Sequence, residues 1–404
     1  MPFQKGGRQL RVSMLARALV AQGHTVTWIT STFVHLDKEE LFPTDHIVQQ
    51  GERYQIHLLS AGGYRKNLSF RRYLFYRRYA DRLHAYLRQL PVPDIIVCGF
   101  PQIDAAVVGV DYACSQHIPI IVDVRDFWPD GMVDFFPAPV RPLVRILLFR
   151  QFQHTRHVFR SATALCAMSH GVLQWAMARA SRRAGDNDQV FPLGYPHSPL
   201  VPDAPSAAIQ SLAQKIASRV SLAYVGTFGH TYDLSTVVAA AEQLAARHDE
   251  RYHFLLIGRG PSYPAIVAKT RNLPNVTCTD WQGPEAVQFL LGHCQAGILP
   301  WKGPAGAMPN KFFDYLAASL PVISSAQGEL NDLIMAERIG SCYQADDVGG
   351  LLKAIAALCA FSAVTAEHRA NARRIFVERF DEELVYTKFS DHIEKVANEA
   401  AHFG

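Results

Sequence analysis

The sequence predicts an α/β protein made of two doubly wound domains, each with a parallel sheet covered by helices on both faces. Two observations support this fold class. Short runs of continuously apolar residues alternate with helical patterns along the chain, which is typical of parallel strands buried on both faces. The length of 404 residues exceeds one ordinary hydrophobic core and suits two domains of about 200 residues each.

The composition excludes several other classes of protein. Hydrophobic residues make up 49% of the chain and charged residues 19%, which excludes a disordered, collagen-like or disulfide-stapled chain. The seven cysteines lie far apart, without a CxxC pair or a Cys/His cluster at zinc spacing, and are interpreted as reduced core residues of a cytoplasmic protein. No apolar run reaches the ~18–20 residues of a membrane span, and residues 11–22 indicate an amphipathic helix rather than a signal peptide.

The first half of the chain alternates between helical patterns and apolar runs. The expected helices lie at 10–22, 69–88, 103–115, 139–160 and 170–182. The expected strands lie at 26–29, 54–59, 94–98, 120–124 and 164–168. Residues 195–206 follow with four prolines and no periodicity, which makes them the best linker candidate.

The second half repeats this alternation more regularly. The expected strands lie at 221–225, 253–257, 276–279, 296–299 and 321–324. The expected helices lie at 234–246, 262–272, 285–293, 309–318, 328–337 and 383–399. We therefore assign four parts to the chain, namely a first domain at 1–195, a linker at 196–218, a second domain at 219–376, and a C-terminal helix at 377–404 that packs back on the first domain.

Gly6 and Gly7 stand directly before the first expected helix. A glycine pair allows a ligand to approach the backbone there, and a helix N-terminus offers free N–H groups to an anion. An ordinary turn explains the same pattern. Such a loop normally follows the first strand of a domain, but only residues 1–5 precede it. We therefore expect either a truncated start or an N-terminal sheet that lacks a strand.

Two further glycine loops follow strands of the second half, at 226–229 and 258–261. Neither matches GxGxxG or a P-loop, so the sequence does not support classical dinucleotide or ATP binding. Each glycine could be a plain turn residue. Their place at the carboxyl ends of parallel strands favours ligand binding, with Gly229 and Arg259 as candidates.

The most informative segment is 303–321, with the sequence GPAGAMPNKFFDYLAASLP. Lys311 stands in the first turn of the helix expected there, where the helix dipole disfavours a cation unless an anion docks on the same end. Asp314 lies one turn further on the same side, and its carboxylate could accept hydrogen bonds from two vicinal hydroxyl groups. A solvated Lys311–Asp314 pair is the alternative.

Charged residues also follow the strongest apolar strand of the first half. Arg125 and Asp126 belong to the sequence DVRDFWPD at 123–130. Charges at the carboxyl end of a buried strand are costly unless they are paired or functional. Arg125 could simply pair with Asp123 or Asp126, and otherwise these side chains line a cleft.

The net charge of +4 conceals an asymmetry between the halves. Residues 1–200 carry 23 Lys and Arg against 15 Asp and Glu, whereas the remaining residues carry 17 against 21. The excess is concentrated at 64–88, which includes Arg71, Arg72, Arg77 and Arg78, and in five arginines at 141–160. Basic helices with interleaved aromatic residues suit an anionic membrane surface or a lipid phosphate. A solvated basic face is an alternative, and no nucleic-acid-binding motif accompanies the patch.

Together these segments resemble the retaining family-4 (group 1) glycosyltransferases of the GT-B fold. The resemblance rests on GGR with the following helix, on GHTVT, VDVRDFWPD, YVGTFG, LIGRGP and AGILP, and above all on PNKFFDYLAASLPVI at 309–323. The last segment resembles the branch that builds bacterial capsule, O-antigen and exopolysaccharide units. The resemblance implies two Rossmann-like domains that face a cleft.

The resemblance also implies the substrates and their places. A nucleotide-sugar donor would bind mainly to the second domain. A glycan or polyprenyl-diphosphate-linked acceptor would bind to the first domain, at the inner face of the plasma membrane. Hexosyl or N-acetylhexosaminyl transfer with retention would follow, without a metal or other cofactor. The carried-over donor residues are Gly6, Gly7, Met308, Pro309, Asn310, Lys311 and Asp314, with Asp314 at the ribose and Asp126 near the reacting sugar.

Three positions depart from the family pattern. The first acid of the Glu-x7-Glu motif falls at Gly306, Ser319 replaces a glycine, and residues 227–233 lack the usual Arg/Lys pair. These departures leave two other interpretations open. One is a sugar-nucleotide epimerase of the same fold, and the other is a non-catalytic sugar-nucleotide-binding protein.

Overall fold

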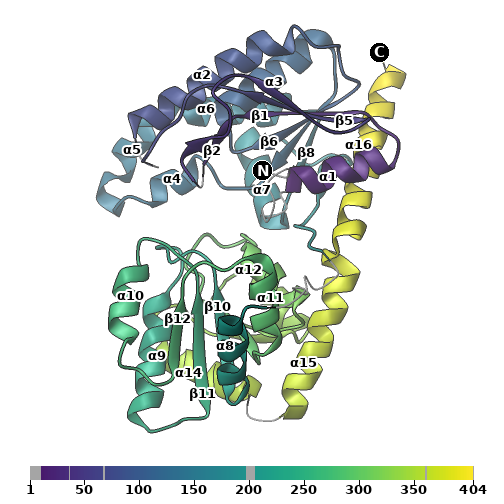
Figure 1. The fold of residues 1–404 in the computed structure, drawn as a ribbon. Coiled ribbons are helices and arrows are strands. Elements are labelled where there is room, and N and C mark those ends of the chain that lie inside the picture. Colours follow the sequence, from purple (N-terminus) through teal and green to yellow (C-terminus); the bar gives the residue numbers. More distant parts are fainter. Residues whose placement is uncertain (1–10, 36, 67–68, 197–204, 360–361, 404) are drawn as a thin grey trace. The chain divides into compact units, whose positions relative to one another are not determined.

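The computed structural model describes residues 11–35, 37–66, 69–196, 205–359 and 362–403 (Figure 1). The chain divides into two compact units. Unit 1 comprises Met1–Pro192 and Val385–Gly404, and unit 2 comprises Leu193–Leu384. Gly6 and Gly7 lie outside the described residues, so the expectation of a missing first strand stays a prediction.

Unit 1 contains a parallel sheet in the order β6-β7-β8-β9. Its strands are Ile96–Phe100, Ile120–Val124, Ala164–Ala167 and Gln189–Val190. Strand β7 is buried along its whole length, as its continuous apolar sequence predicts. The two-residue strand β9 is too short for a periodic signal and was not expected from the sequence.

A second sheet in unit 1 has the order β1-β5-β4. Strand β1, Val26–Ser31, pairs in parallel with β5, Tyr54–Leu59, as the sequence predicts for two strands of a parallel sheet. Strand β4, His46–Gly51, was not expected and pairs antiparallel with β5. It is an exposed edge strand with few apolar residues, so the hydrophobic pattern does not reveal it. A small antiparallel pair follows β1 along the chain, β2 at Phe33–Val34 and β3 at Glu39–Glu40.

The helices of unit 1 lie close to the predicted ranges, with one break. They are α1 (Arg11–Ala21), α2 (Phe70–Leu87), α3 (Ile103–Gln116), α4 (Asp130–Asp134), the 3-10 helix η1 (Ala138–Val140), α5 (Arg141–Leu147), α6 (Phe149–Ser161) and α7 (His170–Ala180). The single helix expected at 139–160 is wrong, because Leu148 leaves helical geometry (φ −93°, ψ 9°) and separates α5 from α6.

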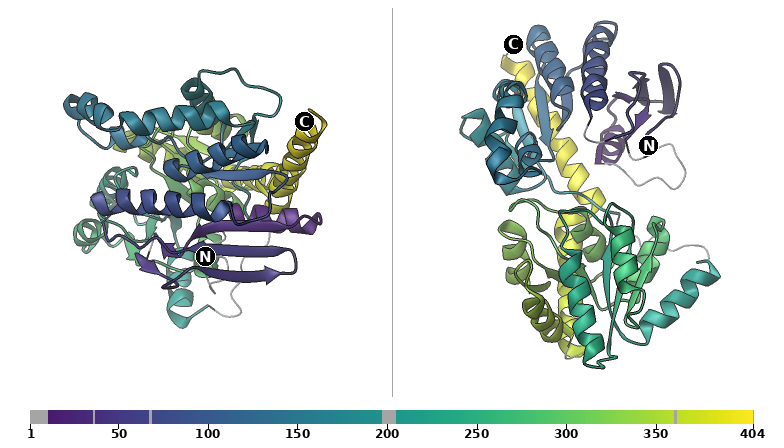
Figure 2. Two further views of the ribbon diagram at one scale, coloured as in Figure 1. Left: turned by 90° about the horizontal axis from the view of Figure 1, so that it is seen from above. Right: turned by 90° about the vertical axis from the view of Figure 1, so that its left-hand side faces the viewer.

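The C-terminal helix α16, Glu382–Phe403, packs on unit 1 from Val385 onward (Figures 1 and 2). Phe389 stacks on Phe191 with ring centroids 4.3 Å apart and an interplanar angle of 8°. Both rings belong to the apolar core of the unit. This packing confirms the prediction that the last helix returns to the first domain.

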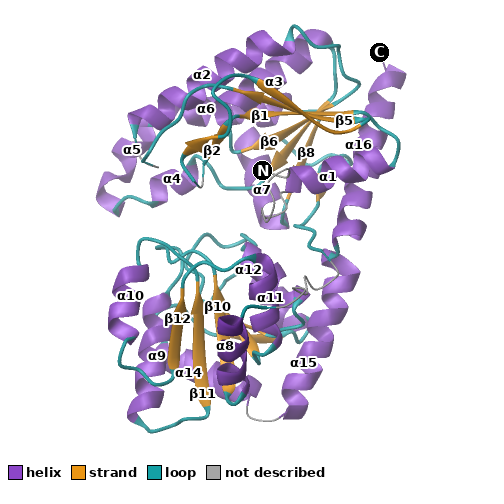
Figure 3. Cartoon of the chain, in the orientation of Figure 1, coloured by secondary structure: helices purple, strands orange, loops and turns teal. Residues whose placement is uncertain are grey.

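Unit 2 has one parallel sheet in the order β12-β11-β10-β13-β14-β15, drawn as a layer between helices in Figure 3. The strands are Val220–Val225 (β10), Tyr252–Ile257 (β11), Val276–Thr279 (β12), Ala296–Leu299 (β13), Val322–Ser324 (β14) and Gly340–Cys342 (β15). The strand order reverses between β10 and β13. Ligands of doubly wound sheets bind at the carboxyl ends of the strands at such a switch point.

The helices of unit 2 include one inside the range expected to be a linker. They are α8 (Ala207–Ala217), α9 (Leu234–Ala246), α10 (Tyr263–Thr270), α11 (Pro284–Gly292), α12 (Asn310–Ala317), α13 (Glu329–Ala336), α14 (Val348–Cys359), α15 (Ser362–Ile375) and the π-helical turn η2 (Phe376–Phe380). Helix α8 forms because Ser206 caps it and because Ala213 and Ile216 are buried.

Within the described residues, no single helix has the length and apolar composition to cross a membrane. The helices Val348–Cys359 and Ala363–Phe380 have that length and composition only when they are taken together, and the chain bends by 92° between them.

Candidate active site

Two glycine loops interlock at the switch point of unit 2. The loop after β10 and the loop after β11 are joined by a hydrogen bond from Phe228 N to Arg259 O (2.8 Å). A Cβ atom on Gly258 would overlap the carbonyl oxygen of Gly226, and Gly258 has a φ of +144°. Only glycine fits these two constraints. The glycines at the carboxyl ends of β10 and β11 therefore bring two loops into backbone contact at the edge where a ligand would bind.

The side chain of Lys311 lies on the first of these loops. Its Cε and Nζ atoms occupy the space that a side chain on Gly226 would fill. The ammonium lies 3.4 Å from the ring centroid of Tyr232 and 5.2 Å from that of Tyr224. Lys311 is only 6% exposed, so the alternative interpretation of a solvated Lys311–Asp314 pair does not describe this lysine. The lysine of α12 thus places a positive charge beside the loop that lacks the Arg/Lys pair of the family.

Helix α12 is anchored at the switch point through Tyr315. Its hydroxyl donates to the carbonyl of Ile298 in β13 (3.0 Å) and accepts from the N–H of Val225 in β10 (3.2 Å). Its ring lies against Gly297, where any Cβ atom would overlap it. Burial raises the pKa of Tyr315 well above its usual value, so the hydroxyl stays protonated. This anchor holds the first turn of α12 beside the glycine loops.

The first turn of α12 presents the other predicted donor-binding residues. Pro309 is the N-cap and contributes no side-chain hydrogen bond to the turn. Asn310 is exposed, and Met308 and Asp314 are half-buried. The N-terminus of α12 beside Lys311 thus receives no side-chain cap from Pro309, and helix N-termini of this kind bind anions.

The position of the missing acid lies near the start of α13, whose first residue is a glutamate. Gly306 adopts a φ of +84°, and its amide nitrogen is 3.6 Å from the site of a Cβ atom on Gly328. Gly328 is the N-cap of α13, and the half-buried Glu329 is its first residue. The sequence reasoning missed Glu329, since 23 positions separate it from Gly306 in the chain.

Asp233 is a second residue that the sequence reasoning missed. It caps α9 by accepting a hydrogen bond from Thr236 N, and it also accepts one from Asp346 N (2.9 Å). Lys302 lies 3.4 Å away. Burial alone would raise the pKa of Asp233, but hydrogen bonds from Ser235, Thr236 and Asp346 outweigh it and lower the pKa to about 2. An Asp at a helix N-cap was the available signal. This carboxylate ties together the loops that follow β10, β13 and β15.

Arg259 and Gly229 occupy the same edge but differ in surroundings. The guanidinium of Arg259 pairs with Asp280 on the loop after β12, and both side chains are exposed. The next residue, Trp281, leaves 57% of its surface exposed. A Cβ atom on Gly229 would make only ordinary contact with Thr227. Arg259 thus forms an ion pair in this structure. The surroundings of Gly229 would accept a side chain.

In unit 1 the charged residues after β7 form a buried ion-pair cluster. Asp123 is fully buried and accepts from Nε of Arg11 (2.9 Å) and from Nε of Arg125 (2.8 Å). Burial would raise the pKa of Asp123, but the two guanidinium groups outweigh it and lower the pKa below its usual value. Arg11 also donates to the carbonyl of Pro192 (2.7 Å). Of the two interpretations of Arg125, pairing with Asp123 is the one observed.

Asp126 is exposed at the same edge. Its Oδ1 accepts a hydrogen bond from the N–H of Phe127 (2.8 Å). The protein atoms crowded around it raise the pKa of its carboxyl above the usual value, although hydrogen bonds from Phe127 and Trp128 act in the opposite direction. Asp130 lies further along the loop and accepts from Trp175 Nε1 (3.0 Å), which holds the start of α4. Asp126 is therefore the carboxylate of this loop that can meet a substrate.

The basic face of α2 divides into two parts. Arg72 lies in an aromatic cage, 5.3 Å from the ring centroid of Tyr76 and 5.2 Å from that of Trp128. Arg71 and Arg78 are exposed, and Arg77 is half-buried. Arg72 therefore acts as a packing residue between α2 and the loop before α4, and the other three remain candidates for an anionic partner.

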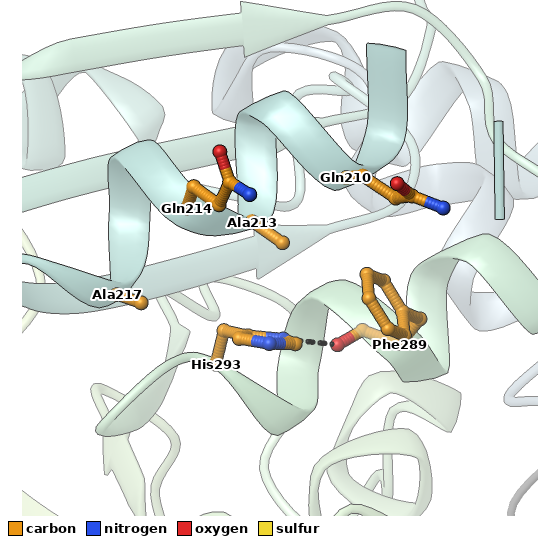
Figure 4. Close-up of a pocket in the computed structure, with 6 residues that line it drawn as sticks. All are labelled: Gln210, Ala213, Gln214, Ala217, Phe289 and His293. Atoms are coloured by element: carbon orange, nitrogen blue, oxygen red, sulfur yellow. Dashed lines mark hydrogen bonds between the residues drawn. The ribbon is translucent and has the colours of Figure 1, made fainter. Parts of the chain in front are cut away.

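A cavity of about 300 Å³ lies between α8 and α11, away from these loops (Figure 4). Its lining residues are Gln210, Ala213, Gln214, Ala217, Phe289 and His293. Nδ1 of His293 lies 2.9 Å from the carbonyl of Phe289. The cavity holds no side chain of the predicted site. Over the described ranges of the chain, no three His, Cys, Asp or Glu residues are grouped as metal ligands.

Comparisons with known structures agree with this architecture. No curated protein matches the chain significantly by sequence. The sucrose-phosphate synthase of Thermosynechococcus elongatus aligns with a TM-score of 0.74 at 18% identity, covering 96% of this chain and 93% of that one. The Anabaena protein HepE, in complex with UDP and glucose, aligns with a TM-score of 0.62 at 12% identity, covering 84% and 86%. WaaG, a glycosyltransferase involved in lipopolysaccharide biosynthesis, gives 0.63 at 13% identity, covering 95% and 94%.

These structural neighbours confirm the predicted fold class, GT-B with two Rossmann-like domains. Two family descriptions match the sequence itself. The "Glycosyl transferase 4-like domain" matches residues 6–194, and "Glycosyl transferases group 1" matches residues 219–360, so that together they cover most of the chain. The chain therefore belongs to the group 1 glycosyltransferases, the family that its motifs resemble.

Proposed function

We propose that this glycosyltransferase takes its sugar from a nucleotide-sugar donor bound at the switch point of unit 2. The observation that carries the proposal is Lys311, whose ammonium is held on the glycine loop after β10 beside the first turn of α12. A cation, a helix N-terminus and close backbone approach are together suited to a diphosphate. The UDP and glucose bound by HepE support a donor of this class.

Donor binding requires Lys311 to exchange partners. A cation over an aromatic ring is worth about 0.5–2 kcal/mol, and a charge-assisted hydrogen bond to phosphate is stronger than a neutral one. A diphosphate docked on α12 would therefore draw the ammonium from Tyr232. Asp314 would then accept hydrogen bonds from the ribose hydroxyl groups, one turn along the same helix.

The proposed reaction is a front-face transfer with retention that needs no metal or other cofactor. The nucleoside diphosphate leaves as an anion, and Lys311 with the N-terminus of α12 would stabilise its developing charge. Asp126 would lie near the reacting sugar, with Arg125 held beside it by Asp123. The transferred group would be a hexosyl or N-acetylhexosaminyl unit.

The proposed acceptor is a glycan or a polyprenyl-diphosphate-linked saccharide, within the synthesis of a bacterial surface polysaccharide. The lipopolysaccharide role of WaaG supports this class of pathway. The exposed arginines of α2 would face an anionic membrane surface. The enzyme would then work in the cytoplasm, attached peripherally to the inner face of the plasma membrane, and would not bind nucleic acid.

The experiment is a screen of nucleotide-sugars for thermal stabilisation, followed by donor-hydrolysis and transfer assays with the best ligand. A ligand at 100 times its dissociation constant adds about 2.7 kcal/mol to stability, which is readily detected. Lys311→Ala should weaken donor binding by about tenfold or more, the magnitude of one charge-assisted hydrogen bond. Lys353→Ala removes an exposed lysine of α14 and is the matched control.

The outcomes separate the open interpretations. Stabilisation by a nucleotide-sugar with transfer to an acceptor supports the proposal. Stabilisation with release of a free sugar or an epimer indicates the epimerase instead, and stabilisation without turnover indicates a binding protein. Unchanged donor affinity in Lys311→Ala would remove the phosphate role from Lys311.

A further inference from the structure

The segment between the body of unit 1 and α6 exposes an unusual amount of apolar surface. Half of the described large hydrophobic side chains that are exposed in the whole chain belong to residues 135–149. We call these seven side chains the apolar ridge; they are Phe135, Phe136, Val140, Leu143, Ile146, Leu147 and Phe149. Leu147 is 74% exposed and Ile146 is 71% exposed. Single exposed apolar residues are normal, but a contiguous group of this size marks an interaction surface.

The central part of the ridge, on η1 and α5, contributes no fully buried residue to unit 1. A helix of seven residues does not form by its own propensity and normally depends on packing of an apolar face. Here Pro142 stands in the first turn of the helix, and Nε of Arg141 donates to the carbonyl of Phe136 (2.9 Å). Leu143, Ile146 and Leu147 of α5 are therefore exposed and are not part of the core, whereas Val144 is half-buried.

A second apolar group lies at the same end of unit 1. Phe70 and Tyr73 in the first turn of α2 are exposed and stacked, with ring centroids 6.0 Å apart. Arg72, between them in the sequence, lies over the ring of Trp128, two residues before α4. The start of α2 thus packs beside the segment that leads into the ridge. The ridge follows β7, whose carboxyl end also carries Asp126, and α2 follows β5 of the other sheet.

The charge around the ridge is positive. Residues 130–160 contain five arginines and two aspartates. Arg141 lies 3.6 Å from Asp134, and Arg145 lies 3.8 Å from Asp130. Arg150 makes a hydrogen bond to His154 and contacts no carboxylate among the described residues. An apolar surface surrounded by arginines is complementary to the interface of a bilayer, because long basic side chains reach anionic headgroups while apolar ones enter the acyl region.

We propose that the apolar ridge inserts into an anionic lipid leaflet, with Arg141, Arg145 and Arg150 at the level of the headgroups. This inference rests on the membrane attachment in the proposed function, and it assigns that attachment to an inserting surface rather than to charge alone. The insertion places the edge with Asp126 at the bilayer, within reach of a lipid-linked acceptor. Charge on α2 would add to the attraction without entering the acyl region.

The test uses the full chain and vesicles made of equal parts phosphatidylcholine and phosphatidylglycerol. The variant combines Leu143→Ser, Ile146→Ser and Leu147→Ser, and it should fold because all three side chains are exposed. Vesicle co-sedimentation should fall by about tenfold or more, since the variant lacks three apolar side chains that would enter the acyl region of the bilayer. The control combines Val92→Ser and Met335→Ser, two exposed apolar residues elsewhere, and should bind vesicles like the wild type.

Two further readouts separate insertion from the alternatives. Wild-type binding should persist in part at high salt, which weakens charge attraction alone, and Leu147→Trp should show quenching by brominated lipids beyond that of the wild-type tryptophans. Vesicle binding by the triple variant equal to that of the wild type would overturn the proposal. So would a change from dimer to monomer in the variant with vesicle binding unchanged, which would identify a second copy as the partner.

The test is independent of the donor chemistry. The triple variant should keep its thermal stabilisation by a nucleotide-sugar, and Lys311→Ala should keep its vesicle binding. Failure of the wild type to bind any nucleotide-sugar, with its vesicle binding intact, would reject the proposed function and leave the inserting ridge in place.

Discussion

The loops at the carboxyl ends of the parallel strands are held in different ways in the two units. In unit 2 the loops after β10 and β11 are held by backbone contact, since Gly226 and Gly258 leave no room for side chains. In unit 1 the loop after β7 is held by side chains, through the buried contacts of Asp123 with Arg11 and Arg125. The proposed diphosphate would therefore meet mainly backbone in unit 2, whereas the proposed acceptor would meet charged side chains in unit 1.

The largest expected effect lies in the side-chain cluster of unit 1. Asp123→Asn leaves the buried guanidinium of Arg11 and the half-buried one of Arg125 without their carboxylate, and loss of one partner of a buried pair costs about 3–5 kcal/mol. The free energy of unfolding, measured by urea denaturation at neutral pH, should fall by that amount. Asp45→Asn is the control, because its pair with Arg82 is exposed and worth about 1 kcal/mol or less. Equal effects of the two variants would contradict a buried scaffold.

The same cluster gives unit 1 a defined dependence on acid. The pKa of Asp123 lies below the ordinary value of 3.8 in the folded protein, so its stabilising contribution is complete above that value and is lost as the pH falls through the lowered pKa. The amide that replaces this carboxylate in Asp123→Asn cannot titrate. The wild type should therefore lose more stability than the variant below about pH 4, as measured by unfolding at a series of pH values.

The backbone scaffold of unit 2 predicts the next largest effect. Gly258→Ala must shift the loop after β10, because the new Cβ atom overlaps the carbonyl of Gly226 and the φ of +144° is strained for alanine. We expect a loss of about 3 kcal/mol in unfolding free energy together with weaker donor binding. Gly292→Ala, with open space around it, is the control. Wild-type donor affinity in Gly258→Ala would show that the interlocked loops do not shape the donor site.

Asp126 tests the functional side of the unit 1 edge. Asp126→Asn should lower the transfer rate by about 100-fold or more without changing donor affinity, since the residue is proposed to act at the reacting sugar. Because the pKa of Asp126 is raised, the wild-type rate should fall on acidification at a higher pH than an ordinary Asp would give, and the variant should lack this limb. Asp111→Asn removes another exposed acid of unit 1 and should leave the rate unchanged. A pH–rate profile that is identical in Asp126→Asn would exclude the role.

The smallest expected effect concerns the exposed side-chain pair of unit 2. Arg259→Ala removes the pair with Asp280, but both groups are solvated and such pairs contribute little. We expect no measurable change in thermal stability and at most a small loss of donor affinity in calorimetry. A large loss of affinity would show that Arg259 leaves Asp280 to contact the donor.

Much of unit 2 follows from the sequence alone. Continuous apolar strands such as β11 and amphipathic helices such as α9 carry strong local patterns, and the segment from Pro309 to Ile323 carries the resemblance to the family. Unit 1 was less predictable. Strand β4 lies at an exposed edge and pairs through its backbone, so its side chains carry little pattern. The break at Leu148 has no glycine or proline at that position that would predict it.

The sequence by itself determined the α/β class, the alternation of elements and the residues of the family motif, because these depend on interactions between near neighbours. The tertiary structure alone decided three other features. Arg11 reaches Asp123 across 112 positions, Lys311 lies against Tyr232 rather than in solvent, and Leu143, Ile146 and Leu147 of α5 remain exposed. An apolar helical pattern predicts that one face of the helix packs against an apolar surface. Only the packing of the whole chain determines whether its own core supplies that surface or leaves the face exposed.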